Sequence, residues 1–126
     1  MTINPLIFKE LLKRSYRLEG KTRVWNVADS KLWYLTDRQA QGFLDLSNAE
    51  GYRKHITDKE VLLIKNHMKE LIAVLPKKSC NILDLGCGDG KKASLIIEGL
   101  KQHMNIRYCP IDISSYMVSK AAKTMR

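Results

Sequence analysis

Apolar residues recur at helical spacing through the first two-thirds of the chain. Asn4 and Pro5 are typical of a helix start, and the apolar positions between Ile7 and Leu12 then repeat as on one face of a helix. A polar stretch around Glu19 to Arg23 follows. Thr36, with Gln39 three residues later, resembles a capping box ahead of a second helix. We therefore expect residues 1–78 to form a helical N-terminal region.

The clearest helix pattern lies at the end of this region. The residues from Asn48 to Gly51 predict a turn, and Thr57 with Glu60 then has the spacing of a second capping box. Apolar residues at helical spacing follow as far as Leu75: Val61, Ile64, Met68, Leu71, Ile72 and Leu75. Proline cannot continue a helix, so Pro76 is expected to end it. The pattern predicts one helix that begins at Thr57.

Beyond Lys78 the period of the apolar residues changes. The short apolar run Cys80–Leu85 predicts a strand that leads into a glycine turn, after which 93–100 fits a helix. Residues 106–111 predict a second strand, and Ser114 or Ser115 is expected to cap a final helix. This β-α-β-α order requires a parallel sheet. The fold class is therefore α/β, with 79–126 as the N-terminal half of a cofactor-binding sheet.

Composition indicates one ordinary globular domain, with 126 residues, 44% of them hydrophobic and 28% charged. The net charge is +9, and the basic residues are densest near the N-terminus: Lys9, Lys13, Arg14, Arg17, Lys21 and Arg23. Such a cluster fits either an anionic partner such as RNA or a solvated basic helix face. No aromatic-interleaved RNA motif accompanies it, so we favour the solvated face.

Three cysteines, Cys80, Cys87 and Cys109, are an odd number without metal-ligand spacing. They predict neither a disulfide framework nor a metal site, and they favour a reducing cytoplasm. We expect no secretory signal and no membrane span, because charged residues interrupt the N-terminal apolar positions and the apolar runs are short.

The glycine turn carries the main chemical signal. It follows the first predicted strand with the pattern DxGxGxG, formed by Asp84, Gly86, Gly88 and Gly90. Glycines let the chain turn tightly and let a ligand reach the backbone, and the carboxyl end of a strand is where such sheets bind nucleotides. The dinucleotide fingerprint fails, because its third glycine would fall on Lys91. A carboxylate beside the turn instead suits S-adenosylmethionine, which is cationic and carries no phosphate.

Two further residues fit this cofactor. Asp112, at the end of the second strand, is placed to accept hydrogen bonds from the ribose hydroxyls. Lys92, in the first turn of the helix, either pairs with the methionine carboxylate or is a surface lysine. Asp84 fits a cofactor neighbour or a partner of loop amides. Cys87 is expected to fill the loop without acting as a nucleophile.

At these residues the chain resembles a class I S-adenosylmethionine-dependent methyltransferase, and more narrowly the N-terminal part of the histidine-specific family of the ergothioneine-pathway type. The narrower likeness rests on residues 32–35 with 43–46, on 51–58 and on 108–114. It implies that Gly86, Lys92 and Asp112 contact the cofactor. It also implies that Tyr52 helps to bind an amino-acid substrate, the alternative being a half-buried aromatic residue at a helix entry. Arg53, Lys54 and Ile56 depart from the family pattern, so the acceptor is histidine or another small amino-acid-like molecule.

Methyltransferases of this class resemble one another in a seven-stranded sheet, whereas only two strands are predicted here. We expect a truncated Rossmann-like sheet, with residues 1–78 on the substrate or lid side and open edges available for self-association. This implies a catalytically incomplete chain whose catalytic residues remain unknown. The alternative function is a non-catalytic module that binds a cofactor, a partner protein or RNA.

Overall fold

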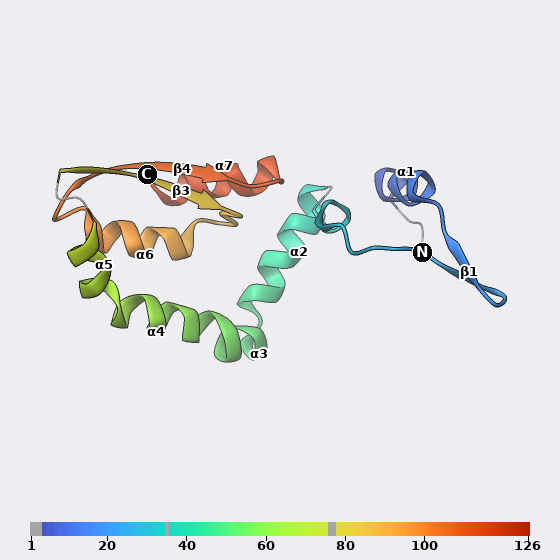
Figure 1. Cartoon of the computed structure of the whole chain (residues 1–126), viewed down its shortest axis with the longest axis horizontal. Coiled ribbons are helices and arrows are strands. Elements are labelled where there is room, and N and C mark those ends of the chain that lie inside the picture. The colour runs from blue at the N-terminus through green and yellow to red at the C-terminus, as the bar shows by residue number, and fades with distance from the viewer. Residues whose placement is uncertain (1–3, 35, 76–77) are drawn as a thin grey trace.

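The computed structural model describes residues 4–34, 36–75 and 78–126. Helix α1 (Pro5–Arg14) and the antiparallel strands β1 (Arg17–Glu19) and β2 (Thr22–Val24) lie at one end, apart from the parallel sheet (Figure 1). An irregular segment, residues 25–29, joins this end to the rest of the chain. Every helix of the described residues is too short or too polar to cross a bilayer.

The start of α1 confirms the sequence prediction. Asn4 is its N-cap, and its side-chain oxygen accepts a hydrogen bond from the Leu6 N–H at 2.9 Å, with Pro5 in the first turn. The helix ends at Ser15, which has a φ of 59° although it is not glycine. This conformation turns the chain sharply from α1 into β1.

The β1–β2 hairpin was not predicted, since its residues fall in the region expected to be helical. Its strands pair Glu19 with Thr22, which leaves a two-residue loop of Gly20 and Lys21. Gly20 has a φ of 62° and occupies the first loop position, where two-residue hairpin turns commonly place glycine. The polar sequence thus folds back on itself because Gly20 permits a tight turn.

A chain of helices connects the hairpin to the parallel sheet. They are η1 (Ser30–Trp33), α2 (Asp37–Asn48), α3 (Glu50–Tyr52), the π-helix η2 (Arg53–Thr57), α4 (Asp58–Asn66) and α5 (Met68–Val74). Thr36 caps α2 as predicted, because its hydroxyl accepts from the Gln39 N–H at 3.3 Å. The predicted turn after Asn48 is also present, as a break at Ala49 with extended backbone.

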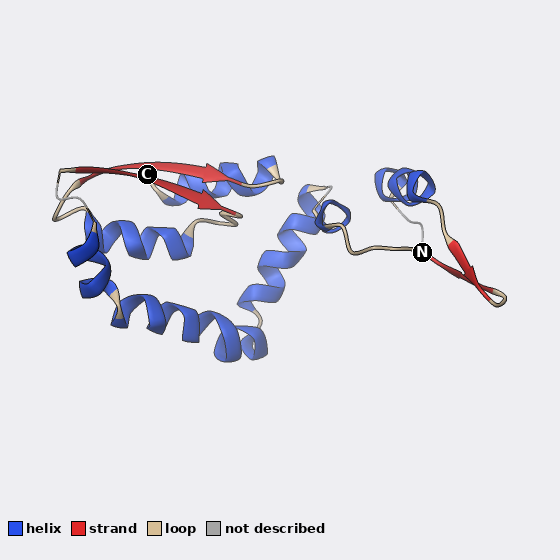
Figure 2. Cartoon of the chain, viewed as in Figure 1, coloured by secondary structure: helices blue, strands red, loops and turns tan. Residues whose placement is uncertain are grey.

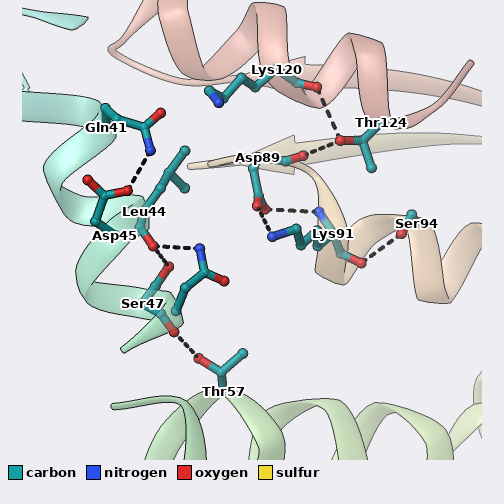
Figure 3. Close-up of polar contacts among 11 residues, drawn as sticks. Gln41, Leu44, Asp45, Ser47, Thr57, Asp89, Lys91, Ser94, Lys120 and Thr124 are labelled. Carbon is teal, nitrogen blue, oxygen red and sulfur yellow. Dashed lines mark hydrogen bonds and ion pairs between the residues drawn. The ribbon is translucent and has the colours of Figure 1, made fainter. Parts of the chain in front are cut away.

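The predicted capping box at Thr57 and Glu60 is wrong. Thr57 has helical φ and ψ values of −60° and −46° and continues the π-helix, so it does not cap a new helix. Its hydroxyl donates to the Ser47 carbonyl at 3.4 Å (Figure 3), while Glu60 pairs with Lys92. The expected single helix is also divided at His67, between α4 and α5. Pro76 lies outside the described residues.

Residues 79–126 form the predicted β-α-β-α unit (Figure 2). Its elements are β3 (Ser79–Leu85), α6 (Lys91–Leu100), β4 (Asn105–Ile111) and α7 (Ser115–Thr124). The two strands pair in parallel, with Ile82 opposite Tyr108 and Leu85 opposite Ile111. Of the two predicted capping residues it is Ser114 that caps α7, accepting from the Met117 N–H at 3.4 Å.

One face of this sheet is partly covered and the other is open. Ile82 and Tyr108 are half-buried on the covered face. On the other face Leu83 is 61% exposed and Leu85 is 76% exposed, and Ile111 beside Leu85 is also exposed. We call Leu83, Leu85 and Ile111 the open face. Apolar strand residues that are exposed to water form a surface on which another protein element can pack.

Among the described residues, a hydrophobic core cluster joins α2 to α7. Ala40 and Leu44 of α2 pack with Met117 of α7, and all three are buried. Tyr116 packs against this cluster, and its hydroxyl donates to the Gln41 side-chain oxygen. The helical region is thereby fastened beside the carboxyl ends of the strands, which is where the glycine turn begins.

Candidate functional site

The glycine turn is held against the end of β4 by backbone hydrogen bonds. The N–H groups of Gly86 and Cys87 both donate to the Ile111 carbonyl, at 2.8 Å and 3.1 Å. Gly86, Gly88 and Gly90 have φ values of 74°, 53° and 76°, a region that other residues rarely adopt. The turn therefore needs glycine at all three positions.

The three glycines differ in what surrounds them. A Cβ added at Gly86 or Gly88 would have no atom within 4 Å, so both positions border open space. A Cβ at Gly90 would lie 2.9 Å from the Cα of Ala121 in α7. Gly86 and Gly88 thus leave room for a ligand at the backbone, whereas Gly90 allows the start of α6 to pack against α7.

Asp112 organises the turn from the end of β4. One carboxylate oxygen accepts from the Gly88 N–H at 3.1 Å, and the other accepts from the Ser114 N–H at 2.9 Å. A carboxylate has about four lone-pair positions, so both oxygens can accept a further hydrogen bond. Asp112 can therefore hold the loop and also receive hydroxyl groups of a ligand.

A pocket of about 300 Å³ opens at this point. Its lining combines the turn, the ends of both strands and the helical region: Tyr34, Phe43, Leu85, Gly86, Gly88, Ile111, Asp112, Ile113 and Met117. The rings of Tyr34 and Phe43 meet edge to face, with centroids 5.7 Å apart. Of the residues predicted for the site, Gly86, Gly88 and Asp112 are brought together here.

Two tyrosines, Tyr34 and Tyr52, interact electrostatically at this pocket. The pKa of Tyr34 is raised first by burial, then by the negative charge of Asp112, and then by Tyr52. The half-buried Tyr52, in α3, is thus near enough to influence the Tyr34 hydroxyl. Tyrosine hydroxyls are protonated at neutral pH, so the Tyr34 hydroxyl can donate a hydrogen bond to a bound molecule.

Asp84 and Lys92 have partners within the protein. Asp84 accepts a hydrogen bond from the Tyr108 hydroxyl at 2.8 Å, and burial followed by this bond raises the pKa of Tyr108. The Lys92 ammonium lies 3.3 Å from a Glu60 oxygen and so connects α6 to α4. Neither Asp84 nor Lys92 is among the residues that line the pocket.

Cys87 is buried between Gly86 and Gly88. Its pKa is raised to about 11, mainly by burial and then by the charges of Asp112 and Asp84. Because thiolates are the nucleophilic form of cysteine, this environment disfavours the reactive form of Cys87 at neutral pH. The prediction that Cys87 fills the loop agrees with this environment.

Tyr34 and Phe43 line the pocket although no sequence pattern marked them as site residues. Both lie within the segments that resemble the methyltransferase family, at 32–35 and 43–46, and this was the available signal. Their position beside Asp112 depends on the packing of α2 against α7, which no local pattern specifies.

The edge of the glycine turn also carries polar contacts to α7. The Thr124 hydroxyl donates to the Asp89 carbonyl at 2.7 Å, and the Asp89 carboxylate lies 3.0 Å from the Lys91 ammonium (Figure 3). The turn is thus held on two sides, by Asp112 and by α7. Such a preorganised loop loses little conformational freedom when a ligand binds.

A parallel β-α-β unit with a glycine turn, and with an acid at the end of the second strand, defines an α/β protein that binds a nucleoside-containing cofactor. The model of the histidine-specific, S-adenosylmethionine-dependent methyltransferases matches residues 30–126, and the chain belongs to that family. The cofactor is therefore S-adenosylmethionine and the enzyme class is methyltransferase. No curated protein and no solved structure matches the chain.

Proposed function

We propose that this chain forms the cofactor-binding part of a methyltransferase that acts on a nitrogen of histidine or of another small amino acid. The observation that carries the proposal is the pocket in which Gly86, Gly88 and Asp112 face the aromatic residues Tyr34 and Phe43. Glycine backbone and a carboxylate suit the cofactor, and a hydroxyl with an aromatic wall suits a small polar acceptor.

The residues of the turn fit the cofactor in shape and in charge. Open space at Gly86 and Gly88 leaves the backbone accessible, and the free lone pairs of Asp112 suit the paired hydroxyls of a ribose. Asp84 and Asp112 also place negative charge near a cofactor that is cationic at sulfur and nitrogen. Lys92 pairs with Glu60 and does not line the pocket, so it would have to reorient toward the pocket in order to pair with the methionine carboxylate.

When bound, S-adenosylmethionine supplies a methyl group activated by its positively charged sulfur. The protein must then hold the acceptor nitrogen in line with that group and keep water away. Asp112 and Tyr52 both act electrostatically on the Tyr34 hydroxyl, so the proposed acceptor position is beside the hydroxyls of Tyr34 and Tyr52. Free Cys80, Cys87 and Cys109 are compatible with a reducing cytoplasm as the setting.

Binding, measured by calorimetry, tests the proposal without requiring turnover. S-adenosylhomocysteine, the demethylated cofactor, is titrated first, and histidine is then titrated into the resulting complex. We expect saturable histidine binding that weakens about tenfold in Tyr52→Phe, because one hydrogen bond is lost. The matched control Tyr16→Phe removes a tyrosine hydroxyl far from the pocket and should leave histidine affinity unchanged. Cofactor binding without binding of histidine or any other amino acid would refute the acceptor assignment.

A further inference from the structure

A second and larger cleft lies at the other end of the molecule. Its volume is about 920 Å³, and it is lined by α1, the hairpin and the segment that follows: Arg14, Ser15, Tyr16, Arg17, Val24, Trp25, Asn26, Val27, Ala28 and Trp33. None of these residues lines the pocket at the glycine turn. All but Trp33 also precede the segment matched by the family model. The methyltransferase assignment therefore leaves this cleft unexplained.

Three exposed aromatic rings dominate the cleft. Tyr16 and Trp25 contact each other across the hairpin, with ring centroids 5.1 Å apart. The guanidinium carbon of Arg23 lies 5.2 Å from the centroid of the Tyr16 ring. Trp33 is fixed in place because its indole N–H donates to the Val27 carbonyl at 3.0 Å. The contacts above fix the positions of the aromatic rings in the cleft, while the rings stay accessible to solvent.

The surroundings of the cleft are positively charged. Residues 4–29 contain six basic and three acidic side chains. Each acid is matched by an ion pair, namely Glu10 with Lys13, Asp29 with Arg14, and Glu19 with Arg17, at 2.6–2.7 Å. A net charge of +3 remains, to which Lys21 and Arg23 of the hairpin contribute. This excess favours an anionic occupant.

We propose that this cleft binds single-stranded RNA. Unpaired bases stack on exposed aromatic rings, and nearby arginines and lysines neutralise the phosphates. The sequence favoured a solvated basic helix face because no aromatic-interleaved RNA motif accompanies the basic residues. The structure removes that objection, since the fold places Tyr16, Trp25 and Trp33 among the basic residues of α1 and the hairpin. An acidic peptide would use the charges but leave the rings without stacking partners.

Tryptophan fluorescence gives a direct measurement of binding. The chain has two tryptophans, Trp25 and Trp33, and both line the cleft. We expect a twelve-nucleotide oligouridylate to quench their emission in a saturable manner. Neutralising about three phosphates should weaken binding roughly tenfold to twentyfold between 50 and 200 mM salt. Absence of quenching by RNA at 50 mM salt would overturn the proposal.

Variants separate stacking from general charge attraction. Trp25→Ala should weaken RNA binding at least tenfold, as read from the remaining Trp33, whereas Trp25→Phe should retain most of the affinity. Arg23→Gln should weaken it several-fold, while Lys101→Gln, the same charge loss at the end of α6, should change it less than twofold. Amide NMR spectra of each variant establish that the hairpin remains folded.

Three results would overturn the assignment to single-stranded RNA. The first is equal weakening by Arg23→Gln and Lys101→Gln, which would reduce the effect to net charge. The second is unchanged affinity in a folded Trp25→Ala variant. The third is equal or tighter binding of an oligoglutamate or of a DNA oligomer of the same length. Asp112→Ala changes the glycine turn and its pocket but none of the residues that line the cleft, so it should leave RNA binding intact.

Discussion

Gly88 and Gly20 both have a positive φ but lie in different parts of the structure. Both have positive φ values, 53° and 62°, and neither has an atom within 4 Å of the position that a Cβ would occupy. Alanine should therefore cost each site a similar amount of stability, about 1 kcal/mol. The two glycines form a matched pair in which only one borders the proposed cofactor pocket.

We predict that Gly88→Ala weakens the binding of S-adenosylhomocysteine at least tenfold, because the added methyl group occupies the space left for the ligand. Gly20→Ala should lower the thermal unfolding temperature about as much as Gly88→Ala does, and it should leave cofactor binding unchanged. Calorimetry and thermal denaturation measure the two effects separately. Equal affinity in the two variants would place the cofactor elsewhere.

The raised pKa of Cys87 leads us to predict how the alkylation of this residue depends on pH. A thiol with a pKa of about 11 is ionised to roughly one part in a thousand at pH 8, whereas an ordinary cysteine is partly ionised there. Alkylation of Cys87 by iodoacetamide should therefore be slow at pH 8 and increase steeply towards pH 10. Cys80 and Cys109 provide internal controls when the modified peptides are followed by mass spectrometry. Preferential labelling of Cys87 at pH 7 would contradict the buried, uncharged environment.

At the scale of the elements, Thr36 and Thr57 show how two similar motifs acquire different roles. The Thr36 hydroxyl accepts from the Gln39 N–H and caps α2, while Thr57 lies inside continuous helical backbone. We predict that Thr36→Ala lowers the free energy of unfolding by about 1 kcal/mol, and Thr57→Ala by about half of that or less. Urea denaturation of both variants provides the comparison. A larger loss at Thr57 would show that α4 begins at that residue.

Several helix caps could be predicted from the sequence, whereas the hairpin could not. Asn4, Thr36 and Ser114 were predictable as caps because a cap depends on residues only two or three positions away. Thr57 matched the same pattern, but the helical residues before it left no free helix end to cap. The hairpin was missed because three-residue strands have too few positions to show alternation, and Gly20 was its main signal.

The site likewise contains residues that could be predicted from the sequence and residues that could not. Gly86, Gly88 and Asp112 were predictable because a strand, a turn and a second strand bring them together within one local unit. Tyr34 and Phe43 reach the pocket through packing between α2 and α7, which are distant in sequence. Glu60 as the partner of Lys92 depends likewise on the approach of α4 to α6. Tertiary contacts of this kind leave no trace in local periodicity.

At the scale of the whole molecule, the open face determines how the chain behaves in solution. Leu83 and Leu85 are largely exposed on a two-stranded sheet whose outer edges are unpaired within the described residues. We predict that the chain self-associates and that Leu83→Thr increases the monomer fraction, because threonine suits a strand and buries less apolar surface.

Light scattering measures this effect against the 14.5 kDa monomer. The matched control is Leu62→Thr, which changes an equally exposed leucine on α4, away from the sheet. That variant should associate as the unaltered chain does. A monomeric unaltered chain, or equal responses to the two substitutions, would show that the open face does not mediate association.

The open face also bears on catalysis, since Leu85 and Ile111 belong both to it and to the pocket. A pocket with an uncovered wall admits water and holds an acceptor loosely, so the chain should bind the cofactor but transfer methyl groups very slowly. Incubation with labelled S-adenosylmethionine and histidine tests this expectation. Rapid turnover by a monomer would show that the helical region closes the site.

The irregular segment 25–29 has an evolutionary consequence. It contacts its neighbours through Trp33 with Val27 and Asp29 with Arg14, among others, and the family match begins directly after it. The buried core around Ala40 and Met117 does not include the hairpin. An ancestral gene could therefore gain, exchange or lose the hairpin without repacking that core.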